Sequence, residues 1–400
     1  MQLWPGGAGP EKEAAMAGDE PRDRTIAAAN GVGGRDPFGA IVPPIYLSTS
    51  YAFAGFDRTR GYDYTRAGNP SRDLLAETLA GLEHGAGAVV TSSGMAALDL
   101  LLAQVLPGGL IVAPHDCYGG TQRLLTARRD RGAFRLALVD PGDPAAMTAA
   151  LAERPALLLI ETPSNPLMRV TDIAALAVRA HEAGARVAVD NTFLSPALQQ
   201  PLLLGADFVI HSTTKYLNGH SDVLGGAVIA ARAEDAEALA EWANITGSVG
   251  SPFDAFLTLR GIRTLFARIE QQQASAMVVA EFLRDRPEVT AVHYPGLSGH
   301  PGHALAARQQ HGFGAMLSFE LQGGLPAVRR LVEAVRVFTL ADSLGGVESL
   351  IAHPATMTHV SMGAEARHRA GIGDGLLRLS VGLEDRRDLL DGLGAGLAAL

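Results

Sequence analysis

The sequence has 400 residues and a formal net charge of −9, and 47% of its residues are hydrophobic and 19% charged. This length and composition are typical of a globular protein with two or three domains and a large core. The acidic balance argues against general nucleic-acid binding, which needs a basic surface. The single cysteine, Cys117, excludes an intramolecular disulfide framework and any metal site that needs several cysteine ligands.

The first 75 residues show few signals of regular structure. Residues 1–35 are rich in glycine, alanine and acidic side chains without periodicity, so we expect a largely disordered leader. Residues 36–75 contain strand-like and loop-like pieces, and Asn69-Pro70 predicts a turn followed by a helix start. There is no basic start followed by an apolar core, and no apolar run reaches the roughly 18 residues that span a bilayer. We therefore expect a cytoplasmic protein without membrane contact.

Residues 76–265 alternate between short apolar runs and longer helical segments, which predicts an α/β domain with a mostly parallel sheet. Helices are expected at GMAALDLLLAQVL (94–106) and TDIAALAVRAHEAG (171–184). Seven runs are apolar at nearly every position, as in strands that are covered on both faces. In chain order these runs are AVVTS (88–92), GLIVAP (109–114), FRLALVD (134–140), ALLLIETP (156–163), RVAVDN (186–191), DFVIHS (207–212) and GGAVIA (225–230).

From about residue 266 the order of predicted elements changes. A long helix near IEQQQASAMVVAEFLRD (269–285) precedes the strand candidates TAVHY (290–294), AMLSFEL (315–321) and LLRLSVGL (376–383). This pattern predicts a separate, smaller α+β domain at residues 266–400. The segment His-Pro-Gly-His at 300–303 is interpreted as a polar loop rather than a metal site, and no metal is expected.

Polar residues follow five of the predicted strands of the α/β domain. In open α/β sheets, ligands bind outside the carboxyl ends of the strands, so we expect these residues to converge on one site. They are Ser93-Gly94-Met95, HDCYGG (115–120), TPSNP (162–166), Asp190-Asn191-Thr192 and the run from Ser212 to Lys215.

Lys215 is one of only two lysines in the chain, the other being Lys12, although Lys and Arg together number 33. Arg stands wherever the chain needs only a positive charge, so a Lys at the end of a strand suggests an amine nucleophile, which Arg cannot supply. The alternative is a solvated loop lysine. The scarcity of lysine favours a chemical role.

The groups around Lys215 match the needs of pyridoxal phosphate, which binds through an amine, a phosphate pocket and an anionic partner for its pyridinium nitrogen. Ser93-Gly94-Met95 opens a helix whose free N–H groups suit a phosphate, with a plain N-cap as the alternative. Asp190 ends an apolar strand, either as the anionic partner or as a cap or loop anchor. The same edge also provides one aromatic ring and two hydroxyl groups: Tyr118, Ser212 and Thr214.

Seven blocks of the sequence resemble, in the right order, those of the Cys/Met-metabolism family of pyridoxal-phosphate enzymes. The resemblance runs from about residue 36 to the end and implies the aspartate-aminotransferase-like α/β fold (fold type I). The blocks are YDYTRAGNPSR (62–72), TSSGMAAL (91–98), APHDCYGGTQRL (113–124), ETPSNP (161–166), DNTFLSPALQQPLLLGADFVIHSTTKYLNGHSDVLGG (190–226), TLADSLGGVESLIAHPATMTH (339–359) and LLRLSVGLED (376–385).

The resemblance implies how the cofactor is held. Lys215 binds the cofactor covalently and shuttles protons, Asp190 pairs with the pyridinium nitrogen, and Tyr118 stacks on the ring and is a candidate base. The remaining implied cofactor contacts are Ser93, Gly94, Met95, Ser212 and Thr214 at the phosphate, with Thr192 and Asn165 nearby. Tyr64 and Arg66, in an N-terminal arm at 36–75, are implied to reach the phosphate of a neighbouring subunit. The implied assembly is a homotetramer, a dimer of dimers.

The resemblance also implies how amino-acid substrates are held. Arg378 takes the substrate α-carboxylate, a bidentate task suited to Arg. Arg123 is the candidate for the distal carboxylate of a succinyl group, and Glu348 for an amino group of substrate or incoming cysteine. Asn165 and Ser349 are further contacts to cofactor or substrate.

The implied reaction is a γ-replacement in which O-succinylhomoserine and cysteine give cystathionine and succinate. Alternatives within the family are γ-elimination of cystathionine and sulfhydrylation of an O-acylhomoserine, and an alternative from another class is a non-catalytic protein that binds pyridoxal phosphate. Two departures bear on the choice. Ala67 stands where a second basic residue is expected for the succinyl group, and Gly120 stands where family members that cleave methionine carry a cysteine.

Overall fold

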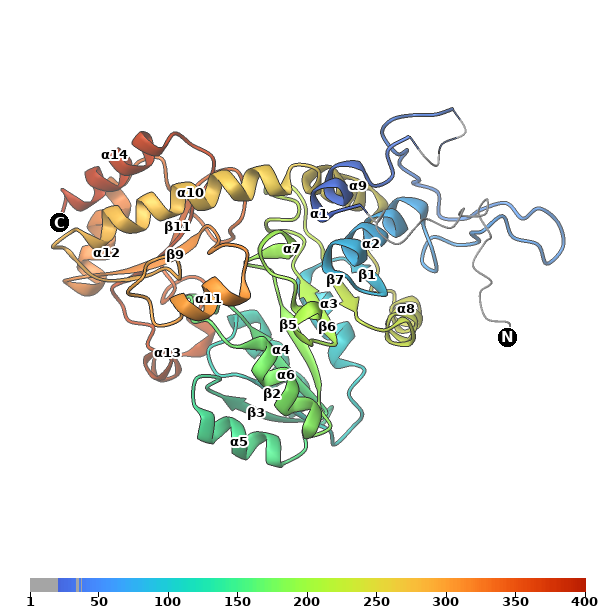
Figure 1. Ribbon diagram of the computed structural model, residues 1–400, viewed down its shortest axis with the longest axis horizontal. Coiled ribbons are helices and arrows are strands. Elements are labelled where there is room, and N and C mark those ends of the chain that lie inside the picture. The colour runs from blue at the N-terminus through green and yellow to red at the C-terminus, as the bar shows by residue number, and fades with distance from the viewer. Residues whose placement is uncertain (1–20, 34–35, 37) are drawn as a thin grey trace.

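The computed structural model describes residues 21–33, 36 and 38–400. Figure 1 shows a large domain at the centre and bottom, a smaller domain on the left, and an N-terminal arm that extends to the right. The long helix α10 (Leu265–Arg284) runs along the top from the large domain into the small one. None of the helices in the described ranges is both long and apolar enough to cross a membrane.

The large domain is built on a seven-stranded sheet with the strand order β1-β7-β6-β5-β4-β2-β3. All neighbouring strands are parallel except those that pair with β7, which is antiparallel to both β1 and β6. The seven predicted strands are confirmed to within two residues at each end. They are β1 (Gly87–Thr91), β2 (Leu110–Pro114), β3 (Arg135–Val139), β4 (Leu157–Glu161), β5 (Arg186–Asp190), β6 (Phe208–His211) and β7 (Gly226–Ala230).

Helices cover both faces of this sheet, which explains why its central strands are apolar at nearly every position between their ends. Ala188, Ile210 and Val228 pack on one face with side chains of α3 (Gly94–Leu102), α4 (Gly119–Asp130) and α8 (Ala233–Thr246). The opposite face packs against α5 (Pro144–Ala152) and α6 (Ile173–Glu182) at β2, β4 and β5. At β6 and β7 it packs against α2 (Pro70–Glu83), α9 (Pro252–Ile262) and α10. Short helices α7 (Ser195–Leu198) and η1 (Pro201–Leu204) link β5 to β6.

The small domain has a five-stranded sheet with the order β10-β11-β12-β9-β8. The predicted strands β8 (Val289–His293), β9 (Met316–Leu321) and β12 (Leu376–Ser380) are antiparallel neighbours, with β9 between the other two and β8 at the edge of the sheet. The sequence did not predict the two short strands β10 (Thr339–Leu340) and β11 (Leu350–Ala352). The accompanying helices are α11 (His303–Gln309), α12 (Gly324–Ala334), η2 (Val360–Met362), α13 (Ala364–Ala370) and α14 (Arg386–Leu397).

The expected leader is partly helical, which corrects the prediction of disorder up to residue 35. Asp23–Ala29 forms α1, and residues 1–20, 34 and 35 of the predicted leader lie outside the described residues. Ala27 of α1 is buried, and Asp23 Oδ2 accepts a hydrogen bond of 2.8 Å from Gln200 Nε2. Contacts with distant segments, which local composition does not report, therefore hold this helix in place.

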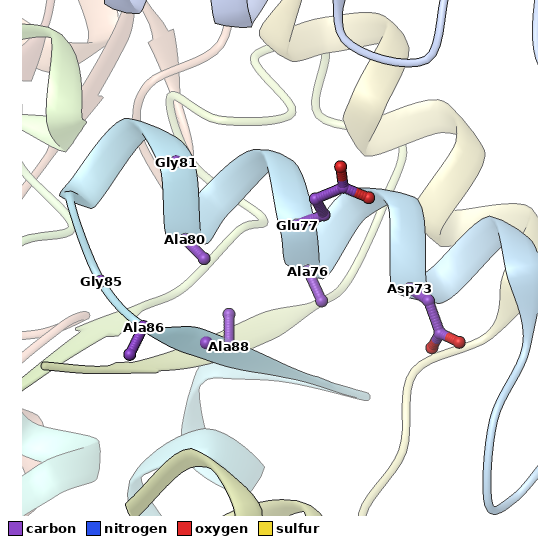
Figure 2. A pocket seen from close by; sticks show the side chains of 9 residues that line it. Asp73, Ala76, Glu77, Ala80, Gly81, Gly85, Ala86 and Ala88 are labelled. Carbon is purple, nitrogen blue, oxygen red and sulfur yellow. The ribbon is translucent and has the colours of Figure 1, made fainter. Parts of the chain in front are cut away.

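The predicted turn at Asn69-Pro70 is confirmed. The Asn69 side chain caps α2 by accepting hydrogen bonds from the N–H groups of Ser71 and Arg72, and Pro70 is the first helical residue. Figure 2 shows a groove between α2 and β1, the edge strand of the large sheet. Small residues that include Ala76, Ala80 and Ala88 line most of it. They leave a surface without large side chains between helix and strand.

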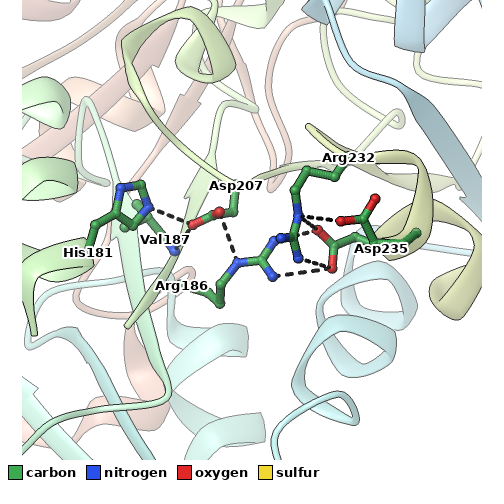
Figure 3. A network of polar contacts seen from close by, with 7 residues as sticks. His181, Arg186, Val187, Asp207, Arg232 and Asp235 are labelled. Atoms are coloured by element: carbon green, nitrogen blue, oxygen red, sulfur yellow. Dashed lines mark hydrogen bonds and ion pairs between the residues drawn. The ribbon is translucent and has the colours of Figure 1, made fainter. Parts of the chain in front are cut away.

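A network of charged side chains joins α6, β5 and α8 at the amino ends of the strands, opposite the edge where ligands are expected (Figure 3). Asp207 contacts His181 and Arg186, each at 2.9 Å, and it precedes β6. Arg186 and Arg232 both contact Asp235 of α8. Burial opposes ionisation of Asp235, but the hydrogen bonds from Arg232 and Arg186 outweigh burial and hold the pKa of Asp235 at about 2.

Replacement of Asp235 by Asn is expected to destabilise the protein at pH 7 by about 1–2 kcal/mol, because the ionised carboxylate is favoured in the folded state. The pKa of Asp235 is depressed on folding, so this stabilisation is complete above the ordinary Asp value of about 3.9 and is lost as the pH falls towards 2. Urea unfolding of both proteins at several pH values between 7 and 3 measures the effect. If the difference in the free energy of unfolding between the wild-type protein and Asp235→Asn did not shrink at acidic pH, the stabilisation would not come from the ionised Asp235 carboxylate.

Candidate active site

One cavity of about 460 Å3 lies where the carboxyl ends of the large sheet meet the small domain. Its lining combines residues from the loops after β1, β2, β4, β5 and β6 with residues of the small domain. Twelve of the residues singled out from the sequence line this cavity. They are Ser93, Gly94, Met95, Tyr118, Arg123, Asn165, Asp190, Thr192, Ser212, Thr214, Lys215 and Arg378.

Lys215 follows β6 and projects its amine into the cavity, where Nζ donates a hydrogen bond of 2.7 Å to Ser343 Oγ. Burial and the nearby charge of Arg378 lower the pKa of Lys215 to about 8, and the carboxylate of Asp342 opposes them. A lysine with this pKa provides a substantial fraction of neutral amine near neutral pH. Lys215 is therefore a competent nucleophile and a proton carrier.

Asp190 is the last residue of β5, and its half-buried carboxylate lies on the cavity. Its Oδ1 accepts a hydrogen bond of 3.0 Å from the Thr192 N–H. Burial nevertheless raises the pKa of Asp190, and the bonds from Thr192 only partly offset it. A carboxylate in this environment is stabilised by a cation, and a protonated ring nitrogen in the cavity would provide one.

The N-terminus of α3 forms a cradle beside Ser212. Ser93 caps the helix with a bond of 3.1 Å from the Ala96 N–H, so it leaves the first N–H groups, those of Gly94 and Met95, at the cavity wall. A Cβ atom on Gly94 would lie 2.8 Å from Ser212 Cβ and 3.1 Å from its Oγ. Only glycine permits this approach, which brings backbone N–H groups and a hydroxyl together as an anion site.

Thr214 and Thr192 complete the rim of this cradle with their hydroxyl groups. The Thr192 hydroxyl accepts a hydrogen bond of 3.0 Å from the Ser212 N–H. The Thr214 hydroxyl accepts from the Gly225 N–H at 3.0 Å and donates to the Gly225 carbonyl at 3.2 Å. Both side chains therefore have fixed orientations around the anion site.

Arg378 lies on β12 with its side chain buried at the cavity floor. One guanidinium nitrogen donates to Asn165 Oδ1 at 3.0 Å and another to the Ser343 carbonyl at 2.9 Å. Burial lowers the pKa of Arg378 to about 10, so the group remains charged at neutral pH. A buried guanidinium that an amide oxygen and a carbonyl oxygen hold in a fixed orientation is suited to an anionic substrate group.

Among the cavity residues that were not predicted from the sequence are Glu161, Asp342 and Ser343, which lie in blocks that carry the resemblance. Glu161 ends β4 beside Asp190 and is buried. Asp342 and Ser343 lie between β10 and β11, close to the charges of Lys215 and Arg378. A carboxylate that ends an otherwise apolar strand, as in LLLIE, was the available signal for Glu161.

The other four site residues do not line this cavity, and two of them, Tyr64 and Arg66, were expected at the cavity of a neighbouring subunit. Tyr64 and Arg66 lie on the arm. Arg66 Nη1 donates a hydrogen bond of 2.9 Å to Asn244 Oδ1, and the Arg66 guanidinium lies over the Tyr64 ring. Glu348 accepts a hydrogen bond from Ser221, and the Ser349 hydroxyl bonds to Glu384. Within this subunit, Asp342 and Ser343 line the cavity, whereas Glu348 and Ser349 do not.

The donor set fits pyridoxal phosphate. The glycine-lined anion cradle suits the phosphate, the carboxylate of Asp190 suits the ring nitrogen, and the amine of Lys215 suits the carbonyl carbon. Tyr118 lines the same cavity and can cover the cofactor ring. A Cβ atom on Gly120 would lie only 2.4 Å from Cε1 of the Tyr118 ring. Within the described ranges, no group of His, Cys, Asp or Glu could hold a metal ion.

Comparisons with known proteins support the conclusion that this cavity fits pyridoxal phosphate. Residues 24–398 match the family model described as Cys/Met metabolism PLP-dependent enzyme. The chain is 53% identical to cystathionine gamma-synthase of Escherichia coli, with 94% of this chain and 98% of the relative covered. It is 42% identical to cystathionine gamma-lyase of Bacillus subtilis, with 94% and 99% covered.

A solved structure of cystathionine gamma synthase from Xanthomonas oryzae pv. oryzae, in complex with cystathionine, superposes with a TM-score of 0.94. It is 58% identical, and the match covers 95% of this chain and 98% of that one. The predicted α/β fold of fold type I is thereby confirmed, and pyridoxal phosphate is confirmed as the cofactor by the family match. The chain belongs to the family of Cys/Met metabolism PLP-dependent enzymes.

Proposed function

We propose that the protein catalyses γ-replacement, in which O-succinylhomoserine and cysteine give cystathionine and succinate. The observation that carries the proposal is a pair of cations that line one cavity together with Lys215. Arg378 lies buried at the floor, and Arg123 is exposed at the rim. This arrangement suits a substrate with one carboxylate at Cα and a second at the far end of an acyl group. The similarity to synthases of this reaction supports the same assignment.

Pyridoxal phosphate supplies a ring that withdraws electrons from the bound amino acid and stabilises negative charge at Cα and Cβ. Arg378 holds the α-carboxylate, and Lys215 removes the Cα proton and then a Cβ proton. Succinate leaves from Cγ, the cysteine sulfur bonds to Cγ with loss of its proton, and Lys215 returns protons to Cβ and Cα. A pKa of about 8 suits an amine that must both accept and donate protons near neutral pH.

Two carboxylates have separate tasks in this scheme. Asp190 keeps the ring nitrogen protonated, which sustains the electron withdrawal. Asp342 lines the cavity near the charges of Arg378 and Lys215, so it is the candidate for the amino group of the incoming cysteine, a role also implied for Glu348. Tyr118 covers the ring and remains a candidate base for the cysteine thiol, since its side chain is 43% exposed at the cavity.

The proposal extends to a homotetramer whose sites are shared between subunits. Tyr64 and Arg66 lie outside their own cavity, and the arm around them exposes large apolar side chains such as Phe38 and Phe56. Exposed apolar surface of this kind is typical of an interface. We propose that the arm covers a neighbouring subunit, with Tyr64 and Arg66 at its phosphate. A monomeric mass in light scattering of the holoenzyme would contradict this assembly. We also propose that the protein is located in the cytoplasm.

One assay series tests the reaction. The holoenzyme receives O-succinylhomoserine or O-acetylhomoserine with either cysteine or sulfide, and in a separate reaction cystathionine alone. We expect the highest kcat/KM for O-succinylhomoserine with cysteine. If cleavage of cystathionine gives the highest value, the protein is a γ-lyase, the alternative that the similarity to the Bacillus subtilis lyase favours. Because Ala67 removes one expected cation, a preference for the acetyl substrate would assign the protein to that acyl group instead.

A further inference from the structure

Glu161 is a buried carboxylate in the cavity wall for which the scheme above has no role. It ends β4 in register with Asp190 of β5, so two carboxylates stand side by side at the sheet edge. Its Oε2 accepts a hydrogen bond of 2.9 Å from the Tyr118 N–H, and its Oε1 accepts one of 3.1 Å from the Asn165 N–H. Each oxygen therefore holds one backbone N–H group.

These two N–H groups belong to different loops of the site. Tyr118 lies in the loop between β2 and α4, and its ring lines the cavity. Asn165 lies in the loop after β4 and is buried. Because Glu161 is fixed on the sheet beside Asp190, it ties both loops to the residue that faces the ring nitrogen.

Asn165 is also held from the small domain. Its side-chain Oδ1 accepts the hydrogen bond from Arg378, and its carbonyl accepts one of 3.0 Å from His359 Nε2. A carbonyl can only accept, so His359 carries its proton on Nε2, and its Nδ1 accepts from the Thr358 hydroxyl at 2.7 Å. Burial and the charge of Arg378 lower the pKa of His359 to about 4, so this side chain is neutral at physiological pH. Because Asn165 Oδ1 accepts from the Arg378 guanidinium, a shift of Asn165 is expected to change the orientation of Arg378.

The carboxyl group at position 161 is unfavourable for stability. Burial and the neighbouring Asp190 raise the pKa of Glu161 to about 8, against the opposing effect of its two N–H donors. A glutamine of equal size would avoid the like charge, but its NH2 group would face one of the two backbone N–H donors. The two backbone N–H groups thus require two acceptor oxygens, although a second carboxylate beside Asp190 is unfavourable for stability.

We propose that Glu161 is a positioning residue whose two oxygens set Tyr118 and Asn165 relative to Asp190 and, through Asn165, orient Arg378. The part that concerns Arg378 rests on the proposed function, whereas the part that concerns Tyr118 rests only on cofactor binding. The change that tests it is Glu161→Gln, which keeps the size and loses one acceptor. Glu83→Gln is the control, because Glu83 is a fully buried carboxylate outside the cavity. Unlike Glu161, it receives both of its contacts, from Asn191 Nδ2 and His211 Nε2, at the single oxygen Oε1.

Three measurements distinguish positioning from a general loss of structure. In Glu161→Gln we expect KM for the amino-acid substrate to rise by about 10- to 100-fold, with a smaller change in kcat, because the carboxylate site is misaligned by a fraction of an ångström. The visible circular dichroism of the bound cofactor should change as Tyr118 shifts, and the Kd of the apoprotein for pyridoxal phosphate should rise. Glu83→Gln should lower thermal stability and leave KM and the dichroism unchanged.

A double-mutant cycle tests the path through Asn165. If Glu161 acts on Arg378 through Asn165, then Glu161→Gln combined with Asn165→Ala should raise KM much less than the product of the single effects. The proposal is overturned by multiplicative effects, by an unchanged dichroism, or by a KM that rises equally in both glutamine variants. The dichroism and cofactor Kd involve no substrate, so a failure of the γ-replacement assay would overturn the proposed function without deciding this one.

If Glu161→Gln does not fold, the wild-type protein supplies the decisive measurement. The Tyr118 and Asn165 amide groups lie in loops, where exchange with solvent is ordinarily fast. Hydrogen bonds to Glu161 should make both amides exchange slowly in the apoprotein, and rapid exchange of either amide would overturn the proposal.

Discussion

Lys215→Ala is expected to reduce turnover by at least about 1000-fold, because one amine both attaches the cofactor and moves the Cα and Cβ protons. Lys215→Arg is expected to be equally inactive, since a guanidinium keeps the charge but is not a neutral nucleophile near pH 7. In both variants the visible absorption that marks covalent attachment of the cofactor should be absent before substrate is added. Steady-state kinetics and absorption spectra of the three proteins measure these effects.

Two controls sharpen this prediction. Ser343→Ala removes only the hydroxyl that accepts from Nζ, so it should weaken turnover far less than loss of the amine. A small primary amine in the buffer should restore part of the activity of Lys215→Ala, where there is space, and none in Lys215→Arg, where the side chain fills it. Substantial activity in Lys215→Arg would show that only the charge matters and would remove Lys215 from the chemistry.

The lowered pKa of Lys215 is directly measurable, because the chain contains only one other lysine, Lys12. In the apoprotein, acylation of Lys215 by an amine reagent should rise with pH through a midpoint near the pKa of about 8. The charge of Arg378 contributes to this lowering, so Arg378→Met should move the midpoint upwards. A midpoint at the ordinary lysine value of about 10.4 would contradict the buried setting of the amine.

The sequence predicted those site residues that lie at the carboxyl ends of the predicted strands. Ser93, Asp190 and Lys215 lie at or shortly after the carboxyl ends of β1, β5 and β6, and strands covered on both faces bring such residues to one sheet edge. The same reasoning located the seven strands of the large sheet. It could not predict α1, because seven residues without a strong apolar pattern are helical only through contacts with Gln200 and other distant side chains.

The sequence pattern could not predict contacts between residues that lie far apart in the chain. Lys215 meets Ser343, and Asn165 meets Arg378, only because the small domain folds onto the sheet edge. The sequence likewise could not show which of Asp342 and Glu348 lines the cavity, since both carboxylates lie in one short block of sequence. The chain turns at Gly345, where φ is 80°, and Glu348 then meets Ser221 while Asp342 stays on the cavity. Sequence spacing alone does not specify that turn.

Arg378→Lys and Arg378→Met are expected to raise KM for the amino-acid substrate by about 100-fold or more, because a buried guanidinium loses its paired carboxylate contact. The guanidinium is held by Asn165 Oδ1 and the Ser343 carbonyl, which leaves its remaining donors in a fixed direction for the carboxylate. Lysine restores the charge but not this paired geometry, so it should recover little. The Kd for pyridoxal phosphate should change much less than KM.

Arg123→Met separates the two cations of the cavity. Arg123 is exposed at the rim and is proposed to meet only the distal carboxylate of the succinyl group. Its loss should lower kcat/KM for O-succinylhomoserine and leave kcat/KM for O-acetylhomoserine nearly unchanged, because the acetyl group has no second carboxylate. Arg378 variants should lose activity with both substrates to the same degree, since both carry the α-carboxylate. Equal losses with the two substrates in Arg123→Met would remove Arg123 from acyl recognition and leave the α-carboxylate as the one anion that the cavity recognises.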